Sequence, residues 1–480
     1  PDASAFQRRT LGELAEAFAT AESSASPVDD AVVATDGPPP VSPGQAALRY
    51  DVRSDPASPR YTITRRHRVE GSLDIDRLHD ALLAVIGAHE TLRWTFSEPR
   101  RELSPEEALE WSVVSSTVDV DALADEQARR RFDIDAGPLL RATVVRGAHG
   151  AAELLLSAHH LWCDARSFDL LWDHLDAAYR GGQLEAPPVG YGRLAERHRE
   201  RVDDAAVARA AAALPDDARS PSPGFAAPTA PEADGYRRLD VRLDAPPDRI
   251  VPAFLAAVTL ALVDDDTSVV GLPMTTRDAD ARTSIGYFLN TVPLLLPRPD
   301  HGSFDSLVRE VDDRLARALD HRQVPLADLV AERRRHARST DLSRVMVVHD
   351  PPTDELTIDE AKVPGETIFN SAAITDLSLF VTETPTGAVI AAEWSGRRYG
   401  ADDVDALLTR LAVILQAGTA SPDRSLDALA AASVAAASEL SGPELDAVTT
   451  TVLDDIWARA DDDRPAVGHS EVSLTYRELD

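Results

Sequence analysis

The stretch from residue 151 to residue 179 constrains the fold more than any other, because it joins a strand to a helix through a polar turn. Its first part is mostly apolar and predicts a buried strand, whereas from Phe168 onward apolar residues recur at helical spacing. The turn between them reads His-His-Leu-Trp-Cys-Asp and begins at His159. Because chemistry is often placed on turns that a rigid scaffold positions, we predict an α/β unit with a functional site at this turn.

The two histidines are expected to play different parts, because successive side chains of a strand point to opposite faces. His160 is the candidate for a general base that faces a cleft, since histidine titrates near neutral pH. His159 is the candidate for a packed, hydrogen-bonded side chain, and Asp164 can brace the turn or pair with a cation. A buried histidine pair beside a helix-capping aspartate would show the same pattern. A metal site is not expected, because no further ligands with suitable spacing follow.

Length, charge and cysteine usage limit the class of protein. The chain has 480 residues, which predicts two or three domains. A net charge of −32, from 49 basic and 81 acidic residues, argues against nucleic acid or an anionic membrane as partner. Cys163 is the single cysteine, so no intrachain disulfide can form and a cytoplasmic location is expected. Cys163 could be a nucleophile, but its place in a tight turn favours packing.

The order of predicted elements gives a mixed α/β fold in two lobes. We predict a first lobe at residues 41–215 and a second at 237–435, both with strands and amphipathic helices. Residues 216–236 are rich in Pro, Ser and Ala and are expected to connect the lobes. The longest apolar stretch, 250–263, contains a proline and is too short to cross a bilayer. A linker-like stretch, 421–443, begins near the end of the second lobe and continues past it.

Several motifs occur in the order and spacing of one known family. The His-His-x-x-x-Asp pattern resembles the active-site motif of the condensation domains of non-ribosomal peptide synthetases, and segments before and after it match other motifs of that family. The opening segment resembles the subtype that accepts an L-configured donor. The matching segments are 41–61, 89–96, 132–142, 268–277, 285–294, 321–330 and 376–381.

The resemblance implies a fold and a reaction. It implies two chloramphenicol-acetyltransferase-like lobes in a V-shaped pseudo-dimer, with the active site where the lobes meet. The reaction it implies is amide formation between a donor acyl or peptidyl thioester and an acceptor amino acid. Both substrates would arrive on the 4′-phosphopantetheine of carrier proteins, an upstream donor carrier and a downstream acceptor carrier. No cofactor bound by the domain itself is implied.

The resemblance also assigns roles to residues of this chain. It makes His160 the base or positioning residue, His159 a structural residue, and Asp164 the holder of the turn through a salt bridge. Arg277 is the expected partner of Asp164, although a solvated loop cation would fit the sequence equally well. Asn290 is expected to line the substrate tunnel or to satisfy backbone groups at the start of a strand.

The residues after Asp164 depart from the family pattern. Ala165 stands where the family usually has glycine, and if that glycine needs φ > 0, alanine costs roughly 1 kcal/mol. If the glycine is needed only for room, the methyl group would narrow the tunnel. Arg166 could add positive charge at the tunnel mouth. The backbone N–H groups up to Ser167, at a helix N-terminus, are expected to favour developing negative charge.

Both ends of the chain resemble parts of neighbouring domains. Residues 1–21 resemble the last helix of a carrier protein, and residues 22–40 are linker-like in composition. Residues 436–480 are expected to be linker followed by the start of an adenylation domain, whose first motif resembles Leu-Thr-Tyr-Arg-Glu-Leu near the end. We therefore expect a monomeric piece of a larger synthetase that adjoins an adenylation domain.

Three other functions remain to be distinguished. Epimerisation domains share the histidine motif, but the Asn290 segment and the adenylation-like end favour condensation. Heterocyclisation domains are disfavoured, because they replace the histidine pair with aspartates. A catalytically impaired platform that recruits carriers or trans-acting enzymes is left open by Ala165 and opposed by the retained His160.

Overall fold

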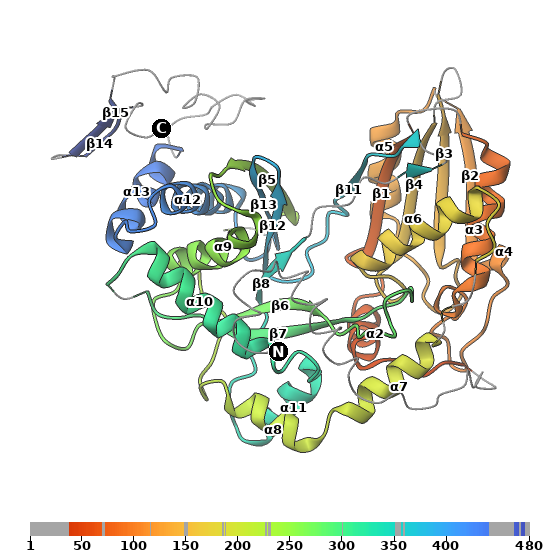
Figure 1. Cartoon of the computed structure of the whole chain (residues 1–480), viewed down its shortest axis with the longest axis horizontal. Helices are drawn as coiled ribbons and strands as arrows, with labels where there is room; N and C mark the ends of the chain where they lie inside the picture. Colours follow the sequence, from red (N-terminus) through yellow and green to blue (C-terminus); the bar gives the residue numbers. More distant parts are fainter. Residues whose placement is uncertain are drawn as a thin grey trace.

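A computed structural model describes residues 38–440, except 70–72, 116, 148–151, 185–186, 188, 226–227, 229–231, 300, 351–356 and 359–360, together with residues 465–469 and 472–475. Two α/β lobes lie next to each other (Figure 1), as the sequence predicts. The carrier-like helix at 1–21, most of the linker at 22–40 and most of the adenylation-like end lie outside the described residues.

The first lobe is built on a five-stranded sheet in the order β11-β1-β4-β3-β2. Helices α3 and α6 pack together over one face, and α5 contacts β1 and β4. Helix α2 starts with a capping box formed by Ser42 and Gln45. The elements of this lobe are α2 (Pro43–Ser54), β1 (Thr62–Val69), α3 (Ile75–Ala88), η3 (Glu90–Leu92), α4 (Pro105–Ala108), β2 (Leu109–Ser115), α5 (Val120–Arg129), β3 (Leu140–Arg146), β4 (Ala152–His159) and α6 (Ala165–Tyr179).

Strand β11 (Gly365–Ile368) belongs to this sheet although it comes from the second half of the chain. It pairs antiparallel with β1, placing Thr64 opposite Ile368 and His67 opposite Gly365. A Cβ on Gly365 would lie 2.4 Å from Nδ1 of His67, so only glycine permits this close approach. The sequence did not predict this strand, because four residues at a sheet edge carry almost no periodic signal.

The second lobe has a six-stranded sheet in the order β5-β13-β12-β8-β6-β7. Its core is formed by this sheet and the helices α9, α10 and α12. The elements are β5 (Gly235–Arg242), α9 (Pro247–Leu262), β6 (Val269–Thr275), β7 (Leu289–Leu295), α10 (Phe304–Leu319), α11 (Leu326–Arg335), β8 (Val345–His349), β12 (Leu377–Thr384), β13 (Gly387–Trp394), α12 (Ala401–Ala420) and α13 (Leu426–Leu440). The remaining strands form two small hairpins, β9 (Thr357–Ile358) with β10 (Ala361–Lys362) and β14 (Pro465–His469) with β15 (Val472–Thr475).

Two boundaries differ from those that the sequence suggested. Helices α7 (Tyr191–Arg201) and α8 (Asp204–Ala212) follow the first lobe, but α8 packs on α11 and shares an apolar cluster with residues of the second lobe. The stretch 421–443 was expected to be a linker, yet most of it is helix α13, which packs on α12. Its alanine-rich sequence buries Leu426 and Leu429, a weak apolar stripe that composition alone concealed.

Within the described residues, none of the helices is both apolar enough and long enough to cross a membrane.

Candidate active site

The histidine motif occupies the turn between β4 and α6. The side chain of His159 is buried against aromatic rings, with centroids 5.7 Å from Trp162 and 6.3 Å from Phe132. Its Nδ1 accepts a hydrogen bond from the backbone N–H of Leu161 at 3.1 Å. Burial lowers the pKa of His159 to about 3, so this ring is a neutral packing and turn-bracing group.

His160 is held in one tautomer by the same turn. Its Nδ1 lies 3.1 Å from the carbonyl oxygen of Cys163. A carbonyl oxygen only accepts, so Nδ1 carries the proton and Nε2 carries the lone pair. The side chain is half-buried, and burial lowers its pKa below the usual histidine value. His160 is therefore a neutral ring at neutral pH, with Nε2 able to accept a proton.

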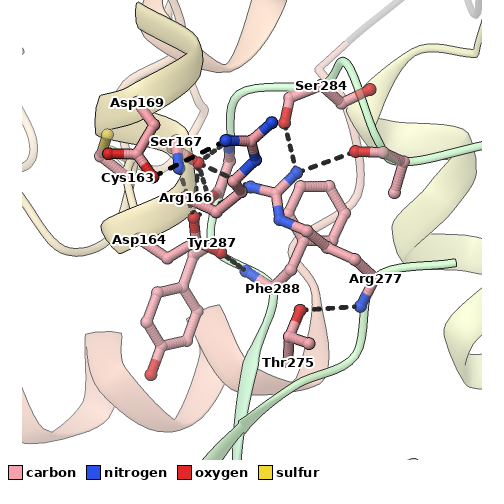
Figure 2. A network of polar contacts seen from close by, with 12 residues as sticks. Cys163, Asp164, Arg166, Ser167, Asp169, Thr275, Arg277, Ser284, Tyr287 and Phe288 are labelled. Carbon is pink, nitrogen blue, oxygen red and sulfur yellow. Dashed lines mark hydrogen bonds and ion pairs between the residues drawn. The ribbon is translucent and has the colours of Figure 1, made fainter. Parts of the chain in front are cut away.

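Asp164 and Arg277 form a buried ion pair between the lobes (Figure 2), with Arg277 Nη2 2.9 Å from Asp164 Oδ1. The other nitrogen of the fork, Nη1, donates to the carbonyl oxygens of Ala281 and Ser284. The guanidinium also lies 4.1 Å from the centre of the Phe288 ring. The structure thus brings together the pair expected from the sequence, and Arg277 is a buried anchor and not a solvated cation.

Ser167 completes this network from the first turn of α6. Its backbone N–H donates to Asp164 Oδ1 at 2.8 Å, which caps the helix. Its hydroxyl lies 2.7 Å from Asp164 Oδ1, 2.7 Å from Arg277 Nη2 and 2.7 Å from the Gly286 carbonyl oxygen. The Gly286 N–H donates to Ser167 Oγ, and the Phe288 N–H donates to Asp164 Oδ2. The second-lobe loop that contains Arg277 is therefore bound to the first lobe through both its backbone and a side chain.

The charges explain why this carboxyl group stays ionised. Burial alone would raise the pKa of Asp164, but the Arg277 guanidinium and the hydrogen bonds from Ser167 hold it below its usual value. Cys163 lies next to it, fully buried, and burial raises the pKa of its thiol. A buried thiol with a raised pKa is a poor nucleophile, which agrees with packing as the role of Cys163.

The residues after Asp164 form the first turn of α6. Ala165 is the first residue of α6 and is exposed, and it is not among the described non-glycine residues with positive φ. The backbone strain considered for an alanine here is therefore absent. Arg166 is exposed and lies 3.8 Å from Asp169 (Figure 2). The Ser167 N–H, which was expected to favour developing negative charge, donates to Asp164 Oδ1.

Asn290 does not reach the histidine turn. It is buried on β7, and its Nδ2 donates to the carbonyl oxygens of Arg322 and Val324 at 2.9 and 2.6 Å. Its Oδ1 accepts from the Leu326 N–H at 3.1 Å. All three contacts are with backbone groups. They agree with the expectation that Asn290 satisfies backbone groups, and not with a place in the substrate tunnel.

Two residues beside the turn were missed by sequence reasoning. The ring of Tyr287 stands edge-on to His160, with centroids 6.1 Å apart, and burial raises the pKa of its hydroxyl. Gln45 of α2 donates from Nε2 to the Leu161 carbonyl oxygen at 2.8 Å. Both lie in segments that matched family motifs, but no local pattern says that Gln45 reaches a turn 116 positions later.

The arrangement of His160 gives the site a group that can accept a proton. In the described part of the chain, no three or more His, Cys, Asp or Glu side chains gather as ligands. One neutral imidazole is fixed by a rigid turn, and the turn is bound to both lobes. This arrangement suits proton transfer to or from a substrate whose reacting group is positioned by other means.

Comparison with known proteins identifies the fold and the family pattern. The family model for the condensation domain matches residues 37–212 and 250–441. The starter condensation domain of the rhizomide synthetase RzmA superposes with a TM-score of 0.66 at 20% identity, covering 81% of this chain and 98% of that one. The first condensation domain of the CDA synthetase gives 0.64 at 21% identity, covering 81% and 97%.

Relatives in sequence are much longer proteins. Surfactin synthase subunit 1 of Bacillus subtilis is 24% identical over 99% of this chain, which spans 14% of that protein. The isonitrile lipopeptide synthase of Mycobacterium tuberculosis is 27% identical over 92% of this chain, which spans 20% of it. Phosphinothricin tripeptide synthetase PhsC of Streptomyces viridochromogenes is 26% identical over 93% of this chain, which spans 46% of it.

Proposed function

This chain belongs to the condensation-domain family of non-ribosomal peptide synthetases, and on that premise we propose that it forms an amide bond between two carrier-bound substrates. Domains of this family are acyltransferases that act on carrier-bound substrates. The donor is an acyl or peptidyl thioester and the acceptor is an aminoacyl thioester, each on the 4′-phosphopantetheine of a carrier protein. The neighbours that we propose are an upstream carrier, a downstream carrier and an adjoining adenylation domain.

The observation that carries the proposal is the fixed tautomer of His160. Its Nδ1–H is bound to the Cys163 carbonyl oxygen, so Nε2 presents a lone pair at the junction of the lobes. The acceptor amine would attack the thioester carbonyl carbon, forming the C–N bond as the C–S bond breaks. His160 Nε2 would accept the proton that the amine nitrogen loses. It would then donate this proton to the departing thiolate, which leaves as a thiol. If this transfer is not limiting, His160 acts by positioning the amine.

The rigid network around Asp164 supports this role by fixing the turn. Positioning two tethered substrates can contribute ~7–11 kcal/mol of the barrier reduction when the geometry is good. General-base catalysis adds about 100-fold or more. The Asp164–Arg277 pair would therefore act through the turn, and not on the substrate.

A condensation assay tests whether His160 takes part in the reaction. Both substrates are loaded on carrier proteins and amide product is followed by intact-mass spectrometry for the parent, His160→Ala and His301→Ala. His301 is 97% exposed in its side chain and serves as the matched histidine control. We expect product from the parent and the control, and a rate lowered by about 100-fold or more for His160→Ala.

The other outcomes are equally informative. Equal rates for all three proteins would show that His160 takes no part. No product from the parent, with several acceptors tried, would favour a platform that recruits carriers or trans-acting enzymes. The pH profile distinguishes a base from a positioning group: because the pKa of His160 is lowered, a base would keep its activity below pH 6.5 and lose it only in stronger acid.

A further inference from the structure

Arg65 of β1 is a buried cation whose hydrogen-bonding capacity is only partly used. Its side chain is 9% exposed, and its Nε and Nη1 have no hydrogen-bond partner among the described residues. Its guanidinium lies 4.9 Å from the centre of the Phe168 ring. The contact of Nη1 with Asp169 Oδ1 is 3.6 Å, too long for a hydrogen bond.

The sheet register places Arg65 on the face of the first sheet that α6 covers. Thr62 of β1 lies opposite His159, and Arg65 lies opposite Leu156. Side chains alternate along a strand, so Arg65 points to the face opposite to that of Thr62 and His159, the face that α6 covers. His160 is the first residue of the turn that leads into α6, and its pKa is lowered by burial and, to a smaller extent, by repulsion from Arg65.

The surrounding acids compensate Arg65 incompletely. Asp169 is shared with Arg166, whose Nη1 lies 3.8 Å from the second carboxylate oxygen (Figure 2). Asp350, at the end of β8 in the other lobe, is close enough for Arg65 to lower its pKa, although burial raises that pKa on balance. Buried donors without acceptors are costly. An oxygen ligand entering from the His160 side would supply the missing acceptors.

We infer that Arg65 is a specificity-determining residue, which binds a carboxylate on the acyl substrate held beside His160. A carboxylate fits best, because guanidinium–carboxylate hydrogen bonds are charge-assisted and match in geometry. The substrate class is thus an acyl or aminoacyl thioester with an acidic group near the thioester. This inference rests on the proposed function, since it names a substrate class for the same site.

Binding tests the inference without depending on turnover. Carrier proteins bearing succinyl or succinamoyl groups through non-hydrolysable pantetheine amides are titrated into the chain by calorimetry. The two ligands differ only in carboxylate against amide. We expect the parent to bind the succinyl form about tenfold more tightly. Arg65→Met should remove that preference, and Arg65→Lys should retain part of it.

Arg66 provides the matched control. It is the next residue of β1, points to the opposite face, and is bonded to Glu153 and Asp121. Arg66→Met should keep the succinyl preference. Equal binding of both ligands by the parent overturns the inference even if no Arg65 variant folds, and so does an unchanged preference in a folded Arg65→Met protein. If the parent protein still condenses a donor and an acceptor that carry no carboxylate, the proposed function stands without the carboxylate preference.

Discussion

Two segments of the second lobe reach the first lobe, and they are fixed by opposite means. The loop at 276–288 is bound through the ionised Asp164 and Arg277. The segment at 363–376, which carries β11, is bound through the neutral amide of Asn370 and through pairing of β11 with β1. One contact beside the candidate catalytic turn thus depends on charge, and the other depends on backbone hydrogen bonding.

Two carboxyl groups of the second lobe bind the C-terminal end of the segment at 363–376, and one of them, Glu393, has a raised pKa whereas that of Asp164 is lowered. Asp234 accepts hydrogen bonds from the N–H groups of Ala373 and Gly396. Glu393 accepts from the Ile374 N–H at 2.9 Å. Burial, with a smaller contribution from nearby Asp234, raises the pKa of Glu393 to about 7.

The two segments should therefore respond to pH in opposite directions. Asp164 has a lowered pKa, so its contribution to stability is present above pH 4 and is lost as the pH falls through its folded-state value. Glu393 has a raised pKa, so the folded state holds a proton that the unfolded chain has released between about pH 4.5 and 7. A rise in pH through that window therefore lowers the free energy of unfolding through Glu393, whereas a fall in pH lowers it through Asp164.

The largest expected effect comes from removing one ion of the first contact. Arg277→Ala leaves Asp164 buried without its cation, and we expect a loss of about 3–5 kcal/mol in the free energy of unfolding. Urea unfolding at pH 7 measures it. Arg282→Ala, an exposed arginine of the same loop, is the control. A loss below about 1 kcal/mol would show that the ion pair does not hold the loop.

Glu393→Gln tests the opposite pH response of the second contact. The amide oxygen can still accept from Ile374 N–H but carries no charge to bury. Between pH 5 and pH 8 the parent should lose up to about 3 kcal/mol at this site, and the variant should not. Urea unfolding at the two pH values gives the difference, with Glu366→Gln, an exposed glutamate on β11, as control. Parallel pH curves for the parent and both variants would contradict the assignment.

Asn370→Ala tests how much the second contact depends on one amide. Its Nδ2 donates to the carbonyl oxygens of Pro59, Arg60 and Thr62, which precede or begin β1. The Pro59 oxygen also accepts from the Thr62 N–H, but losing the side-chain donor to these carbonyl groups should still cost about 1–3 kcal/mol. Hydrogen exchange should also quicken at the β1–β11 amides.

Asn290→Ala is the natural comparison, because Asn290 also bonds only backbone groups, but within the second lobe. It should destabilise the chain by a similar amount while leaving exchange at β1–β11 unchanged. Equal exchange in both variants would mean that Asn370 does not secure the segment.

Sequence reasoning reached the elements with strong periodicity and the residues inside a short motif. The strand, turn and helix around His160 were confirmed, because each is encoded by local apolar spacing. The two-lobed α/β fold, which the family resemblance implied, was confirmed as well. Arg65, Gln45 and the pairing of β11 were missed. Each depends on contacts between segments far apart in the sequence, and no single segment records where its partner lies.

The smallest expected effect concerns Gln45, a neutral support of the same turn that Asp164 holds by charge. Its Nε2 donates to the Leu161 carbonyl oxygen, while its Oε1 accepts from the Ser42 N–H. Gln45→Leu should cost about 1 kcal/mol in stability, because the ion network still fixes the other end of the turn. Condensation should slow several-fold at saturating substrate with KM little changed, since the His160 ring is less well aimed but no substrate contact is lost.

Gln45→Glu keeps the acceptor for Ser42 and places a charged oxygen against the Leu161 carbonyl, so it should slow the reaction more than leucine does. If both variants instead match Arg277→Ala in stability loss, the turn depends on Gln45 as much as on charge, and the contrast between a charge-fixed and a backbone-fixed contact would no longer hold.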